Sequence, residues 1–356
     1  MKYLKKRKKH MPVWALVLLD AVMVGLVLVI FAFFHHVLPA MRSSAPHPPV
    51  IQNQTQQKPT QPPVETEPRV TEQEGTVPEE TQPPTEPDNR TEWQKKFADR
   101  FTDEVVVTEN SYTSPEVSIT IDTVVTGEGA DKITYYVADV YIASIDNFGA
   151  YTANNELKYF GTQPAVEMAA QSNAILAISG DFITYQKGGF LLRNGEIYAA
   201  EHNRYSICAL FPDGVLETHV GGTYSMEEIL ARNPLQVWSF GPVLLDQNGQ
   251  PRGTYEVSTA VSYPNPRSAI GYYEPGHYCL VIVDGRQEGH SAGMRIPELA
   301  QVFADLGCAA AYNLDGGGTA VMLFGGEIYS RQSNGGRDLG DILLITEAGY
   351  SPQEAE

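Results

Sequence analysis

The chain has 356 residues, with 25 Lys/Arg against 43 Asp/Glu and a formal net charge of −18. Residues 1–42 hold seven of the basic residues and one acid, which leaves 18 Lys/Arg against 42 Asp/Glu in the other 314 residues. This acidic body argues against nucleic acid as a partner, because binding a duplex requires a broad cationic surface. The three cysteines lie in separate apolar runs, which predicts buried thiols without a disulfide framework: Cys208, Cys279 and Cys308.

The N-terminal region predicts a membrane anchor. Residues 1–10 form a basic tail, and residues 11–40 are largely apolar over a length that can span a bilayer as one helix. No clear small-x-small cleavage motif follows this run, which favours a retained anchor over a cleaved signal peptide. The basic flank predicts a single-pass protein with a cytoplasmic N-terminus and an extracellular remainder. Asp20 is unusual in such a span; it fits either a helix-pairing site or a tolerated charge near the interface, and we favour the tolerated charge.

Residues 41–91 predict a disordered linker. They contain eleven Pro with many Thr, Gln and Glu and almost no large apolar residues, so they cannot bury enough surface to fold. Such a segment is semi-extended and holds a domain away from a membrane. We therefore expect the folded domain at residues 92–348, followed by a short tail at residues 349–356.

The folded region predicts an α+β domain that is rich in strands. A capping-box pattern at "TEWQ" predicts a first helix, with Trp93, Phe97 and Phe101 on one face. A second capping box, "SMEE", predicts a short helix, and Pro297 and Gly307 bracket a third. Apolar runs predict strands at "VSITIDTVV", "ITYYVADVYIASI", "AILAIS", "GFLLRNGEIY", "SICALF", "VLETHV", "LQVWSFGPVLL", "SAIGYY", "HYCLVIVD", "AAAYNL", "TAVMLF" and "DILLIT".

Three of these strands end in a carboxylate beside glycine. Asp181 follows "AISG", Asp284 follows "VIV", and Asp315 follows "AAAYNL". Loops at strand ends are where rigid scaffolds place reactive groups, and two carboxylates are what glycoside hydrolysis needs. Asp-Gly is also ordinary turn chemistry, and for Asp284 the two interpretations are equally good.

The stretch "NLDGGGT" is the strongest local signal. Its glycines allow backbone N–H groups to converge on an anion and allow a ligand to approach the main chain. Two arginines beside Gly or Pro add cations suited to bidentate phosphate recognition, Arg267 in "PNPRSAIG" and Arg337 in "GGRDLGD".

In this order, "AISGDF", "SFGPVLL", "NPRSAIG", "VDGRQEGHSAGMRIPELA", "NLDGGGTAVM" and "GGRDLGDILLI" resemble the phosphodiester glycosidase family over about residues 115–346. The resemblance implies a hydrolase that releases the sugar from a sugar-1-phosphodiester. It implies catalytic roles for Asp315 and Asp181. It implies substrate binding by Arg267, Asp284, Asn313, Gly316, Gly317, Gly318, Thr319 and Arg337. The chain departs from the family pattern at Ser179, where Asn is common, at Thr319-Ala320-Val321 and at Arg295.

The expected enzyme is a membrane-anchored glycosidase of the cell envelope that acts on a glycosyl-phosphate polymer or exopolysaccharide. Its partners are that carbohydrate and the membrane. A phosphate monoester leaves easily, so charge stabilisation matters more than a general acid. His290 is either a proton shuttle or a polar loop residue. The alternative function is a non-catalytic glycan-binding or cell-wall-binding module. A third interpretation is a metal-dependent phosphatase, but the sequence shows no dense cluster of carboxylate and histidine ligands. A divalent cation such as Ca²⁺ stays open as a cofactor.

Overall fold

The computed structural model describes residues 88–156, 161–183, 185 and 188–348. The chain divides into two units, Met1–Thr81 and Gln82–Glu356, and every described residue lies in the second. The predicted anchor at residues 11–40 and most of the predicted linker lie outside the described residues. Within the described ranges, no helix has the length and apolar character needed to cross a bilayer.

The first of three sheets contains seven strands, and each hydrogen-bonded pair in it is antiparallel. Its strand order is β1 (Val106–Val107), β2 (Ser111–Thr113), β3 (Val117–Thr126), β4 (Ile133–Ile142), β13 (His277–Val283), β12 (Arg267–Glu274) and β14 (Ala310–Asn313). The long strands are rich in Val, Ile, Thr and Tyr, which suit a pleated surface. Strand β14 is the edge strand that leads into the glycine run.

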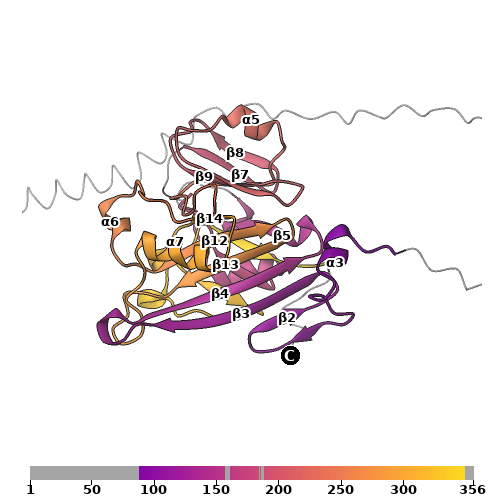
Figure 1. Cartoon of the computed structure of the whole chain (residues 1–356), viewed down its shortest axis with the longest axis horizontal. Helices are drawn as coiled ribbons and strands as arrows, with labels where there is room; N and C mark the ends of the chain where they lie inside the picture. The colour runs from indigo at the N-terminus through magenta and orange to yellow at the C-terminus, as the bar shows by residue number, and fades with distance from the viewer. Residues whose placement is uncertain (1–87, 157–160, 184, 186–187, 349–356) are drawn as a thin grey trace, which may run out of the picture. The chain divides into compact units, whose positions relative to one another are not determined.

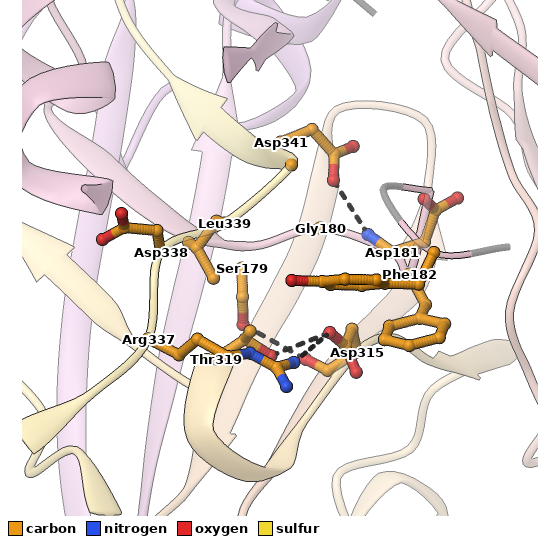
Figure 2. A pocket seen from close by; sticks show the side chains of 12 residues that line it. Ser179, Gly180, Asp181, Phe182, Asp315, Thr319, Arg337, Asp338, Leu339 and Asp341 are labelled. Atoms are coloured by element: carbon orange, nitrogen blue, oxygen red, sulfur yellow. Dashed lines mark hydrogen bonds and ion pairs between the residues drawn. The ribbon is translucent and has the colours of Figure 1, made fainter. Parts of the chain in front are cut away.

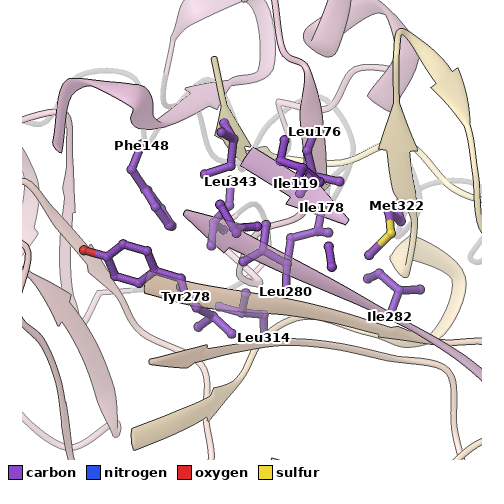
Figure 3. Close-up of a cluster of buried hydrophobic side chains, with 14 of the residues drawn as sticks. Ile119, Phe148, Leu176, Ile178, Tyr278, Leu280, Ile282, Leu314, Met322 and Leu343 are labelled. Atoms are coloured by element: carbon purple, nitrogen blue, oxygen red, sulfur yellow. The ribbon is translucent and has the colours of Figure 1, made fainter. Parts of the chain in front are cut away.

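The second sheet contains five antiparallel strands and packs face to face on the first. Its order is β16 (Glu327–Ile328), β15 (Met322–Phe324), β6 (Leu176–Ser179), β17 (Asp341–Ile345) and β5 (Phe148–Thr152). Side chains from both inner faces meet in one core, among them Leu280 and Ile282 of β13 with Ile178 and Leu343 opposite (Figure 3). This core fixes the strand ends that carry the site.

One helix covers the outer face of each of these sheets. Helix α7 (Ile296–Asp305) buries Leu299, Ala300 and Phe303 against the outer face of the first sheet, and α4 (Ala165–Gln171) covers the second. The alternation along strands explains both contacts, because neighbouring residues point to opposite faces. Helix α7 begins with the predicted Pro in its first turn, and Glu298 accepts a hydrogen bond from the Arg295 amide at 2.7 Å.

The third sheet lies beside this stack and forms its own small core (Figure 1, top). Its order is β10 (Leu216–His219), β9 (Ile207–Leu210), β11 (Gln236–Trp238), β7 (Phe190–Arg193) and β8 (Glu196–Ala200). Helix α5 (Met226–Leu230) begins at the predicted Ser225 cap and packs on this sheet through Ile229. Strand β7 delivers Arg193 toward the second sheet.

Two short α-helices and five 3-10 turns complete the described elements. They are α3 (Glu92–Lys96), α6 (Thr259–Ser262), η2 (Gly129–Asp131), η3 (Ile145–Asn147), η4 (Ala153–Asn155), η5 (Gly317–Thr319) and η6 (Ser333–Gly335). The predicted strand-rich α+β class is confirmed. Two predicted elements were too long. Helix α3 ends before Phe101, and the strand expected over "LQVWSFGPVLL" stops at Trp238, since Gly241 with φ +90° and Pro242 interrupt it.

Candidate active site

Three of the quoted motifs come together where strands of the two packed sheets end. The Asp315 amide donates to the Gly180 carbonyl at 2.9 Å, which joins "NLDGGG" to "AISGDF". The Ser268 hydroxyl donates to the Ser179 carbonyl at 2.8 Å, which adds "NPRSAIG". All three motifs follow or begin a buried strand, so the packed core holds the loops they form.

A cleft of about 400 Å³ opens at this junction. Its wall includes Phe182, Phe240, Arg267, Arg286, Asp315, Gly316, Gly317, Gly318 and Arg337. A second cavity of about 10 Å³, the size of one water molecule, lies beside it and is lined by both Asp181 and Asp315 (Figure 2). The junction therefore combines aromatic rings, cations and carboxylates in one concave place.

Asp315 is the carboxylate that faces this cleft. Its side chain is 14% exposed, and its Oδ2 lies 3.0 Å from the Thr319 hydroxyl and 3.4 Å from the Arg337 guanidinium (Figure 2). Burial raises the pKa of Asp315 to about 6, against the opposing effects of Thr319 and Arg337. At neutral pH this carboxylate is ionised and poorly solvated, which is a reactive combination.

The glycine run at residues 316–318 allows close packing of the backbone and offers few free amides for an anion. A Cβ at Gly316 would lie 2.4 Å from the Pro266 carbonyl oxygen, so no larger residue fits. The Gly317 amide donates to the same carbonyl at 2.9 Å, with φ +66°, and the Gly316 amide hydrogen-bonds the Asp315 carboxylate. Two of the three amides expected to converge on an anion thus already have protein partners.

Two arginines present charge to the cleft. Arg337 has a side chain that is 46% exposed and lies 5.8 Å from the Tyr185 ring centre. Arg286 is exposed, with φ +57°, and donates to Asn265 Oδ1 at 2.6 Å. Arg286 was not among the predicted site residues, although "DGR" placed it beside a candidate carboxylate. Together these guanidiniums make the cleft a cationic place in an acidic protein.

Arg267 lines the same cleft but uses most of its donors on the protein. It is 3% exposed and donates to the carbonyls of Met294 at 2.9 Å, Val261 at 2.7 Å and Tyr263 at 2.9 Å. Burial, together with the charge of Arg286, lowers the pKa of Arg267 to about 10. Its side chain therefore braces the segment around α6, which forms part of the cleft wall.

Asp181 has a different environment from Asp315. Its side chain is fully buried, and Oδ2 lies 2.9 Å from Arg193 and accepts from the Ser239 amide at 2.7 Å. Arg193 also contacts Asp341 at 2.8 Å, and Asp341 Oδ1 accepts from the Asp181 amide at 3.1 Å. In Figure 2 the Asp181 carboxylate points away from Asp315. In this conformation it does not reach the cleft.

The Asp181–Arg193–Asp341 triad holds two carboxylates around one guanidinium. Burial and the neighbouring Asp181 charge raise the pKa of Asp341, although Arg193 opposes them. Gly180 makes this arrangement possible, since a Cβ there would lie 2.2 Å from Asp341 Oδ1. Arg193 and Asp341 were missed from the sequence. The available signals were a charge inside "FLLR" and an acid at the start of "DILLI".

Asn313, Asp284 and His290 lie outside the cleft wall. Asn313 is buried, and its side-chain NH₂ group donates to the Gly241 carbonyl at 2.8 Å. Asp284 is 2% exposed and accepts from His290 Nε2 at 2.7 Å, which places His290 in a polar loop rather than at the cleft. The substrate-binding roles of Asn313 and Asp284 stay predictions, and neither side chain reaches the cleft in this conformation.

The chemistry of a metal site is missing from the described residues. No three His, Cys, Asp or Glu side chains among them gather closely enough to hold a metal ion. Asp181 and Asp341 already share Arg193, so they do not fit a Ca²⁺ site. The three cysteines are all buried and unpaired by disulfides, as predicted.

Comparison with known proteins supports the predicted family resemblance. Residues 172–346 match the family model described as phosphodiester glycosidase. The chain is 27% identical over 199 residues to the SPbeta prophage-derived uncharacterized protein YomE of Bacillus subtilis (strain 168), covering 53% of this chain and 31% of that protein. It is also 27% identical over 186 residues to N-acetylglucosamine-1-phosphodiester alpha-N-acetylglucosaminidase of Bos taurus, covering 47% and 34%. The chain thus spans about a third of the length of these curated relatives.

Solved structures show the same fold. The catalytic domain of zebrafish N-acetylglucosamine-1-phosphodiester alpha-N-acetylglucosaminidase, auto-inhibited by its pro-peptide, matches with a TM-score of 0.53 at 21% identity, over 68% of this chain and 88% of that one. A hypothetical protein from Synechocystis matches with a TM-score of 0.52 at 16% identity, over 65% and 62%. At these identities the structures support the fold alone. The family match over residues 172–346 and the bovine relative confirm the predicted resemblance of this domain to the phosphodiester glycosidase family.

Proposed function

We propose that the domain hydrolyses a sugar-1-phosphodiester, with Asp315 at the reacting carbon. The observation that carries this proposal is the environment of Asp315. Its carboxylate is largely desolvated, its pKa is raised to about 6, and it lies beside Arg337 in a cleft large enough for a sugar. The family match supports a hydrolase of this class. The bovine relative is named for the release of N-acetylglucosamine from a 1-phosphodiester, and we propose the same type of bond as the target here.

The reaction breaks the bond between C1 of the sugar and the phosphate oxygen. The electron pair of that bond stays on the phosphate, which leaves as a monoester whose second pKa is about 6, so protonation of the leaving oxygen contributes little. Asp315 either attacks C1 and forms a glycosyl ester, which water then hydrolyses to free the sugar and the carboxylate, or removes a proton from the water that attacks C1 directly. The Thr319 hydroxyl and the Gly316 amide orient the Asp315 carboxylate through the hydrogen bonds described above.

The phosphate fits the arginine side of the cleft. Arg337 and Arg286 present exposed guanidiniums, and arginine forms paired hydrogen bonds to phosphate oxygens. Arg267 contributes more by bracing the wall, because its donors are used on backbone carbonyls. Charge development on the leaving phosphate would be stabilised by the same two exposed groups.

Phe182 and Phe240 form an aromatic part of the wall, with ring centres 6.1 Å apart. Such rings suit the apolar face of a sugar or the apolar part of the group on the other side of the phosphate. The cleft thus offers one aromatic side and one cationic side to a substrate that has a sugar on one side of a phosphate.

The test is sugar release from a sugar-1-phosphodiester by the purified full chain and by Asp315→Asn. We expect Asp315→Asn to fold, to keep substrate binding and to lose about a thousandfold in kcat, within the range typical of general-base or nucleophile removal. Asp122→Asn, an exposed carboxylate on β3, is the matched control and should keep full activity. Wild-type turnover by a folded Asp315→Asn protein would remove Asp315 from the mechanism. Binding without sugar release by the wild-type chain would favour the glycan-binding alternative.

A parallel incubation with a chelator tests for a metal. Because the described residues contain no suitable ligand cluster, we expect sugar release to be unchanged. A loss of activity that Ca²⁺ restores would contradict this expectation. It would point to ligands supplied by the substrate or by parts of the chain outside the described residues.

The cellular setting is a second part of the proposal. The basic tail at residues 1–10 and the apolar run at residues 11–40 support a single-pass anchor with the catalytic domain outside the cell. The substrate would then be a glycosyl-phosphate polymer of the cell envelope or an exopolysaccharide. Protease added to intact cells should remove the domain, whereas protection that disappears only on lysis would reverse this topology.

A further inference from the structure

A cluster centred on Asp284 lies beside the cleft and has no role in the mechanism above. Asp284 follows β13 and is 2% exposed. Its Oδ2 accepts from the Tyr136 hydroxyl at 2.9 Å and lies 2.7 Å from His290 Nε2, and its Oδ1 accepts from the Arg331 amide at 3.0 Å. A buried carboxylate with three donors is fully satisfied, which argues for a structural task rather than for reaction with a ligand.

The first loop that this carboxylate fixes is the turn at residues 284–291, which carries Arg286. The Ser291 hydroxyl donates to the Asp284 carbonyl at 2.6 Å, and the His290 ring closes the turn onto the Asp284 side chain. Gly285 is packed so closely that a Cβ there would lie 2.7 Å from the Pro266 nitrogen. Arg286 thus has a defined backbone position, with φ +57°, at the edge of the cleft.

The second loop is the segment that runs from Arg331 to Arg337. The turn holds both backbone groups of Arg331: Asp284 accepts from its amide, and the Gln287 side chain donates to its carbonyl at 2.8 Å. From there the chain passes through η6 and Gly336, where a Cβ would meet the Gln332 side chain at 2.6 Å, before it reaches Arg337. The anchor point of the Arg337 segment is therefore the Asp284 carboxylate.

We propose that Asp284 is a positioning residue that fixes the loops of Arg286 and Arg337 relative to each other, so that both guanidiniums reach one phosphate. This inference rests on the proposed function, because it takes phosphate as the ligand of those arginines. Two guanidiniums in fixed positions bind one anion more tightly than two on independently moving loops, because binding then carries no further entropic cost of ordering the loops. Asp284 itself touches no substrate in this arrangement.

The substitution Asp284→Asn tests this positioning role. Asparagine keeps the shape and can still accept from Arg331, but its NH₂ group would face the Tyr136 or His290 donor, and the negative charge is lost. We expect the two loops to loosen. Arg286 and Arg337 would remain present but would no longer be held at a common distance.

The measurement is calorimetric titration of the full chain with inorganic phosphate, which needs no turnover. We expect Arg286→Ala and Asp284→Asn each to weaken phosphate binding about tenfold, and the double variant to be no weaker than Arg286→Ala. Asp139→Asn is the matched control, because Asp139 also pairs with a histidine at 2.7 Å, His277, elsewhere on the same sheet. It should bind phosphate like the wild type.

The outcomes separate the two proposals. If Arg286→Ala weakens phosphate binding but Asp284→Asn does not, the positioning role is wrong and the phosphate site stands. Additive losses in the double variant would also overturn it, because independent effects are not positioning. If Arg286→Ala and Arg337→Ala both bind phosphate like the wild type, the proposed phosphate site fails, and this inference fails with it. Should Asp284→Asn not fold, Tyr136→Phe and His290→Leu each remove one donor to the Asp284 carboxylate, and each should weaken phosphate binding severalfold.

Discussion

Asp181 and Asp315 follow similar sequence patterns but have opposite environments. Both come after a buried strand and beside glycine, and both line the small cavity between them. Asp181 is sealed against Arg193 and the Ser239 amide, with none of its side chain exposed. Asp315 instead borders the cleft, with a hydroxyl and an exposed guanidinium as partners.

The environments of Asp181 and Asp315 indicate that the role of a carboxylate depends on its counter-ion and its access to water. The buried Arg193 pairs with the Asp181 carboxylate and makes it part of the framework, while burial beside the exposed Arg337 leaves Asp315 with a raised pKa. The two residues remain connected, since the Asp315 amide donates to the Gly180 carbonyl. We therefore interpret the Asp181 region as the support on which the Asp315 loop stands.

Removing the arginine should produce the largest effect. Arg193→Met keeps the volume but leaves Asp181 and Asp341 buried without a cation, which costs about 3–5 kcal/mol of unfolding free energy at neutral pH. A denaturant melt measures this loss. Arg232→Met is the control, because Arg232 pairs with Glu217 at the surface, 44% exposed, and should cost under about 1 kcal/mol. An equal loss of unfolding free energy in the two variants would contradict the framework role of the Asp181 carboxylate.

The pH profile tests the other side of the comparison. Because the pKa of Asp315 is about 6 and the ionised form is the reactive one, kcat/KM should fall about tenfold per pH unit below that value. Stability should respond in the opposite sense. Because the pKa of Asp315 is higher in the folded state, ionisation of this group lowers the free energy of unfolding fully above about pH 6. This loss of stability disappears below about pH 4, close to the pKa of Asp315 in the unfolded chain.

A matched variant isolates that penalty. Asp315→Asn should unfold at the wild-type temperature or higher at pH 8, and the gain should vanish at pH 4. A flat rate profile between pH 5 and pH 7 would contradict the assignment, as would an Asp315→Asn variant that is less stable than the wild type at pH 8.

A smaller change is expected from the hydroxyl on Asp315. Thr319→Val keeps the shape and removes a hydrogen bond that lowers the pKa of Asp315. The acid limb of the rate profile should move upward by roughly half a unit to one unit, as the typical worth of one hydrogen bond implies. The profile of the variant against that of the wild type is the measurement, and a downward shift would be the opposite of this prediction.

The smallest expected effect is that of Asp181→Asn. Its charge raises the pKa of Asp315 less strongly than Thr319 lowers it, so the acid limb should move to lower pH by less than the Thr319→Val shift. Turnover at pH 8 should fall less than tenfold, because the carboxylate does not face the cleft. A loss near a thousandfold in a folded Asp181→Asn protein would return Asp181 to a catalytic role, as its family motif implies.

The sequence predicts the strands and the motif order well, because both depend on local patterns. Strands β3, β12 and β13 contain many apolar and β-branched residues, and their predicted bounds agree with the structure to within a residue or two. Helix α4 was missed, since "AVEMAAQ" has no side-chain cap and only seven residues to show a helical period. A short helix therefore shows too little periodicity in the sequence to be predicted.

Side-chain partners were beyond reach for a different reason. Arg193 belongs to the third sheet and Asp341 to the second, and nothing near either residue in sequence reveals that they meet. The same holds for Asp284, whose donors Tyr136 and Arg331 are far from it along the chain. The family motifs assigned Asp315 and Arg337 to one site. The sharing of Arg193 by two buried carboxylates follows instead from tertiary packing.

The position of β17 has a consequence for the order of folding. This strand lies between β6 and β5 in the second sheet, pairing Ile342 with Ser179 and Asp341 with Thr152. A chain that emerges from the ribosome N-terminus first keeps β5 and β6 without their shared neighbour until residues 341–345 appear. Because contacts so distant in sequence form slowly, the acid that completes the triad with Arg193 is among the last groups to be delivered. Activity should therefore appear late, after nearly the whole described domain has been synthesised.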